Sequence, residues 1–302
     1  MYGPADDNES TMTIHAALDN GVTLLDTGDF YGIGHNEMLI GRALKGRRDQ
    51  ALLSVKFGAM RSPGGGWIGY DARPEAVKNS LAHSLTRLQV DYVDIYRPAR
   101  LDSRVPIEDT IGAIADLVKE GYVRAIGLSE VGPETIRRAM AVHPICDLQI
   151  EYSLISRGPE ARIFPALDDL GIGTTAYGLL SRGLLCGSTP TRPNDIRGHF
   201  PRFTGDNFGQ NQQLVRALET LARARGVTPG QLAIAWGLAK SSSLVPVVGV
   251  RTRQQLEENL GALDLELSEE EIAHIENAVP AGEVFGTRYG EPQMRDLDSE
   301  RA

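Results

Sequence analysis

The sequence predicts an α/β fold in which parallel strands alternate with helices. Seven short apolar runs with β-branched residues are typical of buried strands, and helical patterns separate them. Strands at this spacing pair in parallel through right-handed crossovers, which favours a closed (β/α)8 TIM barrel. The predicted strands cover residues 22–26, 51–56, 92–96, 123–128, 145–150, 172–176 and 244–248.

The predicted helices have recognisable faces and ends. Thr228 before Pro229 is an N-cap followed by a first-turn proline, and Ser268 with Glu271 forms a capping box. Glycines that follow an apolar periodic stretch are typical helix stops. Gly121 follows a helix whose apolar face includes Ile111, Ile114, Ala115 and Val118. Gly171 follows a helix whose apolar face includes Ile163, Phe164, Leu167 and Leu170.

An eight-strand barrel needs one strand more than the seven predicted here. A helix over residues 11–20 precedes the first predicted strand, so we expect the N-terminal hairpin and first strand to be the missing parts. The alternative is an open sheet of seven strands, whose two unpaired edges would promote association.

The whole chain, residues 1–302, is expected to form one domain. Two segments, 61–71 and 187–213, look irregular and follow strands, and long insertions at that place in a barrel often cover the active face. We expect both, together with the C-terminal segment 280–302, to lie over that face. The alternative for each loop is a mobile surface segment.

Composition favours a small-molecule enzyme. The 302 residues are 41% hydrophobic and 24% charged, and their net charge of −9 disfavours a nucleic acid or an anionic membrane as partner. Two cysteines, Cys146 and Cys186, give no disulfide framework, and no apolar run is long enough to span a bilayer. We therefore expect a cytoplasmic protein. The six histidines lack paired ligand spacing, so no metal site is expected.

Reactive side chains follow the carboxyl ends of the predicted strands. Asp26 and Lys56 end the first two, and Tyr31 lies in the turn after the first. A tyrosine has a pKa of ~10, but a cation ~4 Å away favours its phenolate by roughly 4 kcal/mol at an effective dielectric near 20. Asp26 would keep Lys56 charged, so the three could act as a proton donor. The alternative is a buried Asp–Lys pair that ties two strands, beside an ordinary turn tyrosine.

Five ordered motifs resemble the aldo-keto reductase family over nearly the whole chain. They are LLDTGDFYG with SVK, GYVRAIGLSEV, DLQIEYSLISR, TAYGLLSRGLL and VPVVGVRTRQQLEENLGAL. The resemblance implies metal-free hydride transfer between NADPH and an aldehyde or ketone inside a (β/α)8 barrel. It also implies that Tyr31 is the general acid, which Lys56 and Asp26 tune.

The resemblance implies a set of NADP contacts as well. Arg251 lies just before a predicted helix, and a guanidinium beside a helix N-terminus is a good phosphate site, so we expect NADP rather than NAD. By resemblance, the nicotinamide carboxamide is held by Ser129 and Gln149, and its ring stacks on Tyr177. The pyrophosphate is cradled by Gly178, Leu179, Ser181, Gly183 and Leu184. The adenosine phosphates face Gly249 and Arg251, and the adenine lies at Gln255, Glu258 and Asn259.

The sequence departs from the family pattern at the third predicted strand. Ala99 stands where relatives usually have a histidine, and loss of one oxyanion donor typically costs ~100 to 1,000-fold in rate. We expect the substrate pocket to include Trp67, Arg97 and Ala99, with Arg97 and Arg100 as possible replacements for the histidine.

The Ala99 segment also indicates a branch of the family. The stretches PARLD, VPIEDTIGAI and VFGTRY resemble pyridoxal reductases, which suggests pyridoxal as one possible substrate. Its phenolic hydroxyl can hydrogen-bond its own carbonyl. A generic carbonyl reductase and a cofactor-binding regulatory protein with little turnover stay open as alternatives.

Overall fold

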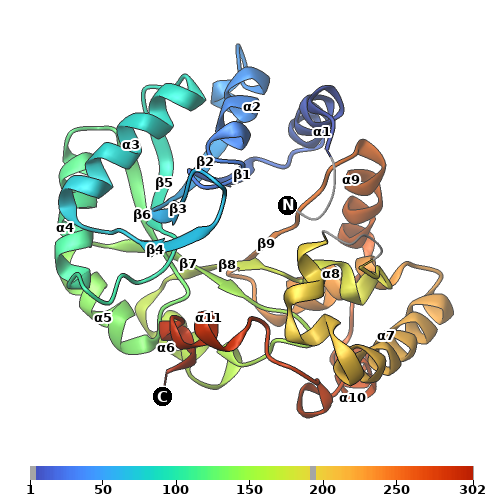
Figure 1. The fold of residues 1–302 in the computed structure, drawn as a ribbon. Coiled ribbons are helices and arrows are strands. Elements are labelled where there is room, and N and C mark those ends of the chain that lie inside the picture. Colours follow the sequence, from blue (N-terminus) through green and yellow to red (C-terminus); the bar gives the residue numbers. More distant parts are fainter. Residues whose placement is uncertain (1–4, 191–194, 302) are drawn as a thin grey trace.

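Seven parallel strands form a nearly closed barrel in the computed structural model, which describes residues 5–190 and 195–301 (Figure 1). Their order in the sheet is β1-β2-β5-β6-β7-β8-β9, and every neighbouring pair is parallel. All seven predicted strands are confirmed within two residues. Their bounds are β1 Leu24–Gly28, β2 Leu52–Phe57, β5 Val93–Pro98, β6 Val123–Ser129, β7 Ile145–Glu151, β8 Gly173–Tyr177 and β9 Leu244–Val247.

The sheet curls strongly enough to bring distant strands together. The side-chain amide of Gln149 on β7 donates a hydrogen bond of 2.7 Å to Asp26 on β1, across the interior. Within the described residues, β1 and β9 do not pair with each other, so they are the two ends of the sheet. Helix α1 (Asp7–Asp19) precedes β1, as predicted, and Glu9 on it forms an ion pair with Arg253 after β9.

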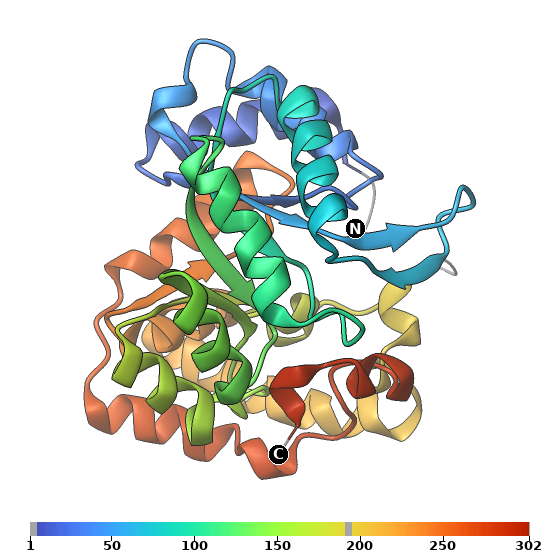
Figure 2. The ribbon, with the colours of Figure 1, turned by 90° about the vertical axis from the view of Figure 1, so that its left-hand side faces the viewer.

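The helices cover the outside of the barrel (Figures 1 and 2). Buried aliphatic side chains of the strands, such as Leu53, Val55, Ile126 and Leu128, pack in a core that the inner helix faces complete. The remaining helices are α2 His35–Ala43, α3 Pro74–Leu88, α4 Ile107–Lys119, α5 Pro133–Val142, α6 Pro159–Leu170, α7 Gly205–Arg225, α8 Pro229–Lys240, α9 Arg253–Leu260, α10 Glu269–Ala278 and α11 Glu291–Arg295.

The predicted helix ends are confirmed. Thr228 and Ser268 both cap their helices in complete capping boxes, with Gln231 and Glu271 as the reciprocal partners. Gly171 ends α6 in the left-handed conformation, at φ 66°.

Three segments project on the same side of the barrel, beyond the carboxyl ends of the strands (Figures 1 and 2). The prediction of an irregular segment at 61–71 is wrong, because β3 (Ala59–Arg61) and β4 (Trp67–Tyr70) form an antiparallel hairpin. Residues 195–204 form two 3₁₀ turns before α7, and the C-terminal segment runs through α11 to a last 3₁₀ turn at Asp298–Glu300. The part of 187–213 at residues 191–194 lies outside the described residues.

No helix of the described chain combines the length and apolar character that crossing a bilayer requires.

Candidate active site

The structure brings Asp26, Tyr31 and Lys56 together at the carboxyl ends of β1 and β2. The Lys56 ammonium forms an ion pair with Asp26, and their side chains are only 4% and 8% exposed. Lys56 Nζ also lies over the Tyr31 ring, 5.0 Å from its centre. Parallel pairing sets this arrangement, because Lys56 is the register partner of Gly28, two residues past Asp26.

The Asp26 carboxylate is fully used by donors. Beside Lys56, it accepts hydrogen bonds from Ser54 Oγ at 2.9 Å and from Gln149 Nε2 at 2.7 Å. Burial alone would raise the pKa of Asp26, but Lys56, Arg97 and the hydrogen bond from Gln149 hold it below its ordinary value. Asp26 is therefore ionised at neutral pH and provides a fixed counter-ion for Lys56.

Arg97 lies inside the barrel, in register with Lys56. Its guanidinium is completely buried, with Nη1 at 2.9 Å from Asp147 Oδ2 and Nη2 donating to Ser54 Oγ at 3.0 Å. The structure therefore places Arg97 in a charge network with Asp147 and near Asp26. Ala99, two residues later, is 3% exposed, and its amide donates to the Phe57 carbonyl at 2.8 Å.

Arg100 extends from the end of β5 across the barrel mouth. It donates to the hydroxyls of Ser129 at 3.4 Å, Tyr177 at 3.4 Å and Tyr289 at 3.3 Å, and to the Ala99 carbonyl at 2.6 Å. Of the two arginines near Ala99, Arg100 is the one that reaches the rim.

Ser129, Gln149 and Tyr177 end or nearly end β6, β7 and β8 on the same rim. Ser129 and Gln149 are register partners and are almost fully buried. The Gln149 amide is engaged by Asp26, and the Tyr177 hydroxyl donates to Glu130 Oε1 at 2.6 Å. This side of the mouth is therefore linked through Gln149 to Asp26, and so to the trio of Asp26, Tyr31 and Lys56.

The chain after β8 has an unusual backbone. Gly178, Ser181, Arg182 and Gly183 have φ of 77°, 47°, 57° and 87°, all in the left-handed region. For Ser181 and Arg182 this conformation is costly, and such strain concentrates at ligand-binding segments.

Leu179 and Leu184, the leucines predicted to contact the cofactor, are 1% and 2% exposed and belong to the apolar core. They can offer a ligand only their backbone groups. Ser181 is also buried, and its hydroxyl lies 3.0 Å from that of Ser153.

The predicted adenosine-side residues gather around the start of α9. Thr252 caps this helix, and the Arg251 amide donates to Gln255 Oε1 at 3.0 Å. Gly249, Arg251 and Glu258 are exposed, Asn259 is partly buried, and the Glu258 carbonyl accepts a hydrogen bond of 2.8 Å from Gln231. The positive end of the helix and the Arg251 guanidinium make this a region suited to phosphate.

A buried ion-pair network on the rim was missed from the sequence. Glu130 is completely buried and has φ 55°, and Arg288 donates to both of its carboxylate oxygens, at 2.8 and 2.6 Å. Ser299 Oγ donates to it at 2.7 Å. Burial would raise the pKa of Glu130, but Arg288, Arg100 and Tyr177 hold it far below its ordinary value. The C-terminal segment is thereby fixed to the mouth.

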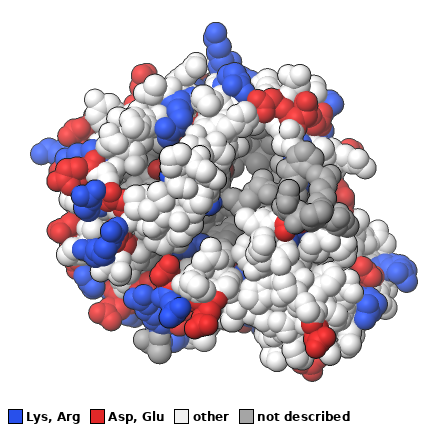
Figure 3. Space-filling model, in the orientation of Figure 1, with Lys and Arg blue, Asp and Glu red and all other residues white. Residues whose placement is uncertain are grey.

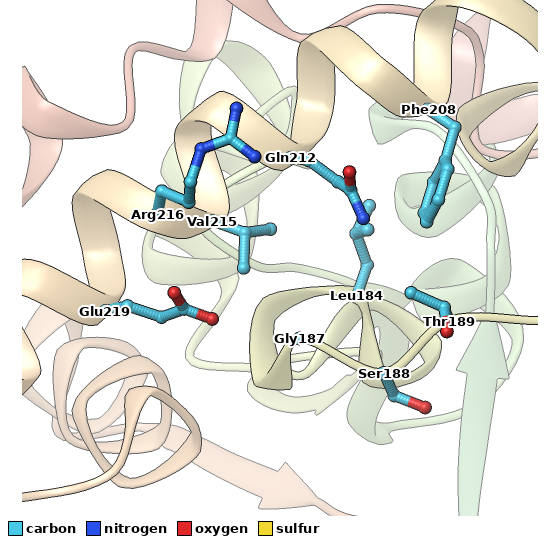
Figure 4. A pocket seen from close by; sticks show the side chains of 9 residues that line it. All are labelled: Leu184, Gly187, Ser188, Thr189, Phe208, Gln212, Val215, Arg216 and Glu219. Carbon is cyan, nitrogen blue, oxygen red and sulfur yellow. The ribbon is translucent and has the colours of Figure 1, made fainter.

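Two cavities of the described residues are lined by other side chains than Asp26, Tyr31 and Lys56. One of ≈ 170 Å³ lies between α7 and the end of the turn after β8, and of the predicted site residues only Leu184 lines it (Figure 4). The other, ≈ 190 Å³, lies under the β3–β4 hairpin and is lined by Tyr70, Arg104 and Asp296 among others. Trp67 is 40% exposed at the hairpin, with its ring centre 4.8 Å from that of Tyr70.

Nothing in the described residues resembles a metal centre, because no three His, Cys, Asp or Glu side chains are grouped to hold an ion.

The surface that faces the viewer is hollowed near its centre, where the strands converge, and charged residues are concentrated around the periphery (Figure 3).

Comparisons with known proteins agree with this geometry. The model of the Aldo/keto reductase family matches residues 1–280. Probable aldo-keto reductase 1 from Glycine max is 40% identical over 292 residues, which cover 95% of this chain and 84% of that protein. The NADP(+) aldo-keto reductase yakc of Schizosaccharomyces pombe is 38% identical over 298 residues, covering 96% and 88%.

Solved structures show the same fold. A glycerol dehydrogenase from Gluconobacter oxydans superimposes with a TM-score of 0.84 at 28% identity, covering 98% of this chain and 88% of that one. An aldo-keto reductase from Klebsiella pneumoniae, in complex with NADPH, gives 0.72 at 26% identity, covering 91% and 86%.

Proposed function

The chain belongs to the aldo/keto reductase family, so its reaction class is NADP(H)-dependent carbonyl reduction, and from this premise we propose that pyridoxal is its substrate and Tyr31 its general acid. The observation that carries the assignment of the acid is the contact of one ammonium, Lys56, with both a buried carboxylate and the Tyr31 ring. The PAR segment around Ala99 supports pyridoxal, because it resembles the branch that reduces this aldehyde.

Tyr31 gives its phenolic proton to the carbonyl oxygen of the substrate. The Lys56 ammonium stabilises the phenolate that results, because a nearby cation favours the charged form of a phenol. Asp26 stays ionised and holds Lys56 in place through their ion pair. When bound, NADPH would supply a hydride to the carbonyl carbon, which together with the proton from Tyr31 gives the alcohol.

The residues present fit an NADP cofactor. Four left-handed residues between Gly178 and Gly183 turn the backbone sharply at the end of β8, where only small residues or backbone groups could line a pyrophosphate. Arg251 and the start of α9 would hold the adenosine phosphates. Ser129, Gln149 and Tyr177 would contact the nicotinamide.

Ala99 favours substrates that supply their own hydrogen bond to the reacting carbonyl group. A histidine at this position would donate to the carbonyl oxygen, and alanine cannot. Pyridoxal compensates in part, because the hydroxyl next to its aldehyde can hydrogen-bond the carbonyl. A substrate without such a group would be reduced more slowly.

The test has two arms, binding and turnover. NADPH at ~100 times its Kd should stabilise the protein by about 2.7 kcal/mol in a thermal shift. NADPH oxidation is then followed with pyridoxal and with a panel of unsubstituted aldehydes. Binding without turnover of any aldehyde would favour the alternative, a cofactor-binding regulatory protein. Turnover of the panel with no preference for pyridoxal would leave a generic carbonyl reductase.

A further inference from the structure

The Arg100 guanidinium is the feature of the barrel mouth that the proposed reaction does not use. It is partly buried, and its side-chain partners are neutral hydroxyls, those of Ser129, Tyr177 and Tyr289. Among residues 5–190 and 195–301, no carboxylate forms an ion pair with it. A guanidinium taken out of water in this way is normally matched by an anion.

Two buried carboxylates of the barrel mouth are committed to other arginines. Arg288 donates to both oxygens of Glu130. Glu151, which is 1% exposed, pairs with Arg182 at 3.1 Å and with Arg202 at 3.6 Å. Either carboxylate could turn to Arg100 only by weakening the ion pairs it already forms.

The ion pairs of this region leave Arg100 outside them. They join three guanidiniums, those of Arg182, Arg202 and Arg288, to three carboxylates, those of Glu130, Glu151 and Glu300, of which the last is 42% exposed. Burial lowers the pKa of Arg202 to about 10, and the neighbouring Arg182 and Arg288 add to this effect, although Glu151 opposes it. Burial would lower the pKa of Arg100 too, but Tyr177, Tyr289 and Glu130 hold it above its ordinary value.

The hydroxyl contacts of Arg100 are weak enough to exchange. Their lengths of 3.3 to 3.4 Å lie beyond the usual N–H···O range, whereas a carboxylate or phenolate oxygen would approach to ~2.7–2.9 Å. The planar guanidinium can also offer two parallel donors to such a group. An anionic oxygen at this place would gain two strong hydrogen bonds and displace three poor ones.

We propose that Arg100 binds an anionic oxygen carried by the carbonyl substrate, so that preferred substrates are aldehydes or ketones with a carboxylate or phenolate near the reacting group. This inference rests on the proposed reductase function and specifies its substrate class. Arg100 directly follows Ala99, so the strand end that lacks the histidine carries the group that orients the substrate. Charge on the substrate thus substitutes for a donor on the enzyme.

The test compares acids with their neutral esters. NADPH oxidation is measured with 3- and 4-carboxybenzaldehyde and with the corresponding methyl formylbenzoates. The wild-type enzyme should prefer at least one acid to its ester. Arg100→Gln should raise KM for that acid by roughly 10- to 100-fold, with the ester changed less than about threefold. Arg100→Lys, which keeps the charge but loses the planar pair of donors, should fall between.

Arg138→Gln is the matched control, because it removes one positive charge from an exposed ion pair with Glu108 on the outer helices. It should leave all four KM values unchanged. Equal losses for acid and ester in Arg100→Gln would contradict the proposal, as would a wild-type enzyme that prefers both esters or shows no preference.

A binding measurement separates this inference from the reductase function. Benzoate should raise the melting temperature of the wild-type protein and of Arg138→Gln, but not that of Arg100→Gln. If no aldehyde is reduced while benzoate binds in this pattern, the proposed function fails and the anion site stands. If aldehydes are reduced while benzoate stabilises all three proteins equally, or none of them, the anion site is contradicted alone.

Discussion

On the β1–β2 side of the barrel mouth, the buried charges come from residues 30 positions apart, whereas on the β6–β8 side the partner of Glu130 lies 158 positions away. Asp26 and Lys56 meet because their strands pair in register, so the fold of the barrel is enough to form the trio. Glu130 needs the C-terminal segment to dock. The charges of the β1–β2 side are therefore brought together by the barrel itself, and those of the β6–β8 side by the docking of the C-terminal segment.

The two sides also differ in how many carboxylates share one cation. Lys56 forms its ion pair with Asp26 alone among the described residues. Arg288 lies within ion-pair distance of three carboxylates, those of Glu130, Glu151 and Glu300. This contrast predicts unequal responses to the loss of a cation.

The largest loss of stability should follow removal of the cation on the C-terminal segment. Arg288→Met leaves Glu130 buried without its main partner, which should cost about 3 to 5 kcal/mol in the free energy of unfolding, measured in urea. Adding Glu130→Gln should recover part of this loss. Arg138→Met, at an exposed pair, should cost less than ~1 kcal/mol. A stable Arg288→Met protein would show that the segment does not depend on this pair.

Lys56→Met removes the cation on the β1–β2 side and should cost less, about 2 to 3 kcal/mol, because Lys56 pairs with one buried carboxylate whereas Arg288 pairs with three carboxylates. Urea unfolding under the same conditions gives the comparison directly. If Lys56→Met were more destabilising than Arg288→Met, the claim that the number of paired carboxylates sets the loss would be wrong.

Asp29, in the turn before Tyr31, provides an effect on stability whose size depends on pH. Its Oδ1 is buried without a hydrogen-bond partner in the described chain. Burial raises its pKa to about 6, which Glu37 reinforces and the Gly58 amide opposes. Because the folded pKa exceeds the unfolded value of ~3.9, the folded protein holds the proton more tightly. The stability from this group is complete below pH ~4 and is lost as the pH rises through about 6.

Asp29→Asn should therefore stabilise the protein at pH 7, by up to about 3 kcal/mol, and much less at pH 4, since the amide has no charge to bury. Urea unfolding of both proteins at the two pH values measures the difference. An equal gain at both values would mean that charge burial is not the cause.

Much of the fold could be predicted from the sequence because its signals are local. Each strand is a short and largely apolar run, and capping residues such as Thr228 and Ser268 mark helix starts. The β3–β4 hairpin was missed because its strands have only three and four residues, and Pro63 with the adjacent glycines dominates the segment.

The candidate site divides in the same way. Asp26, Lys56 and Tyr31 are brought together by strand pairing, which the pattern of strand ends already indicates. The partner of Glu130 could not be predicted, because a buried carboxylate requires a cation but nothing near it in sequence selects Arg288 among 31 basic residues. Arg97 and Arg100 are three residues apart, yet one lies inside the barrel and the other crosses its mouth.

If Tyr31 is the acid of a carbonyl reductase, Tyr31→Phe should remove most of the activity. The ring packs edge-on against Phe30, with centres 4.6 Å apart, and phenylalanine keeps that contact while it removes the proton. We predict a loss of ~10²- to 10⁴-fold in kcat with unchanged NADPH binding, and no effect of Tyr122→Phe, whose side chain is exposed. Full activity in Tyr31→Phe would contradict the account.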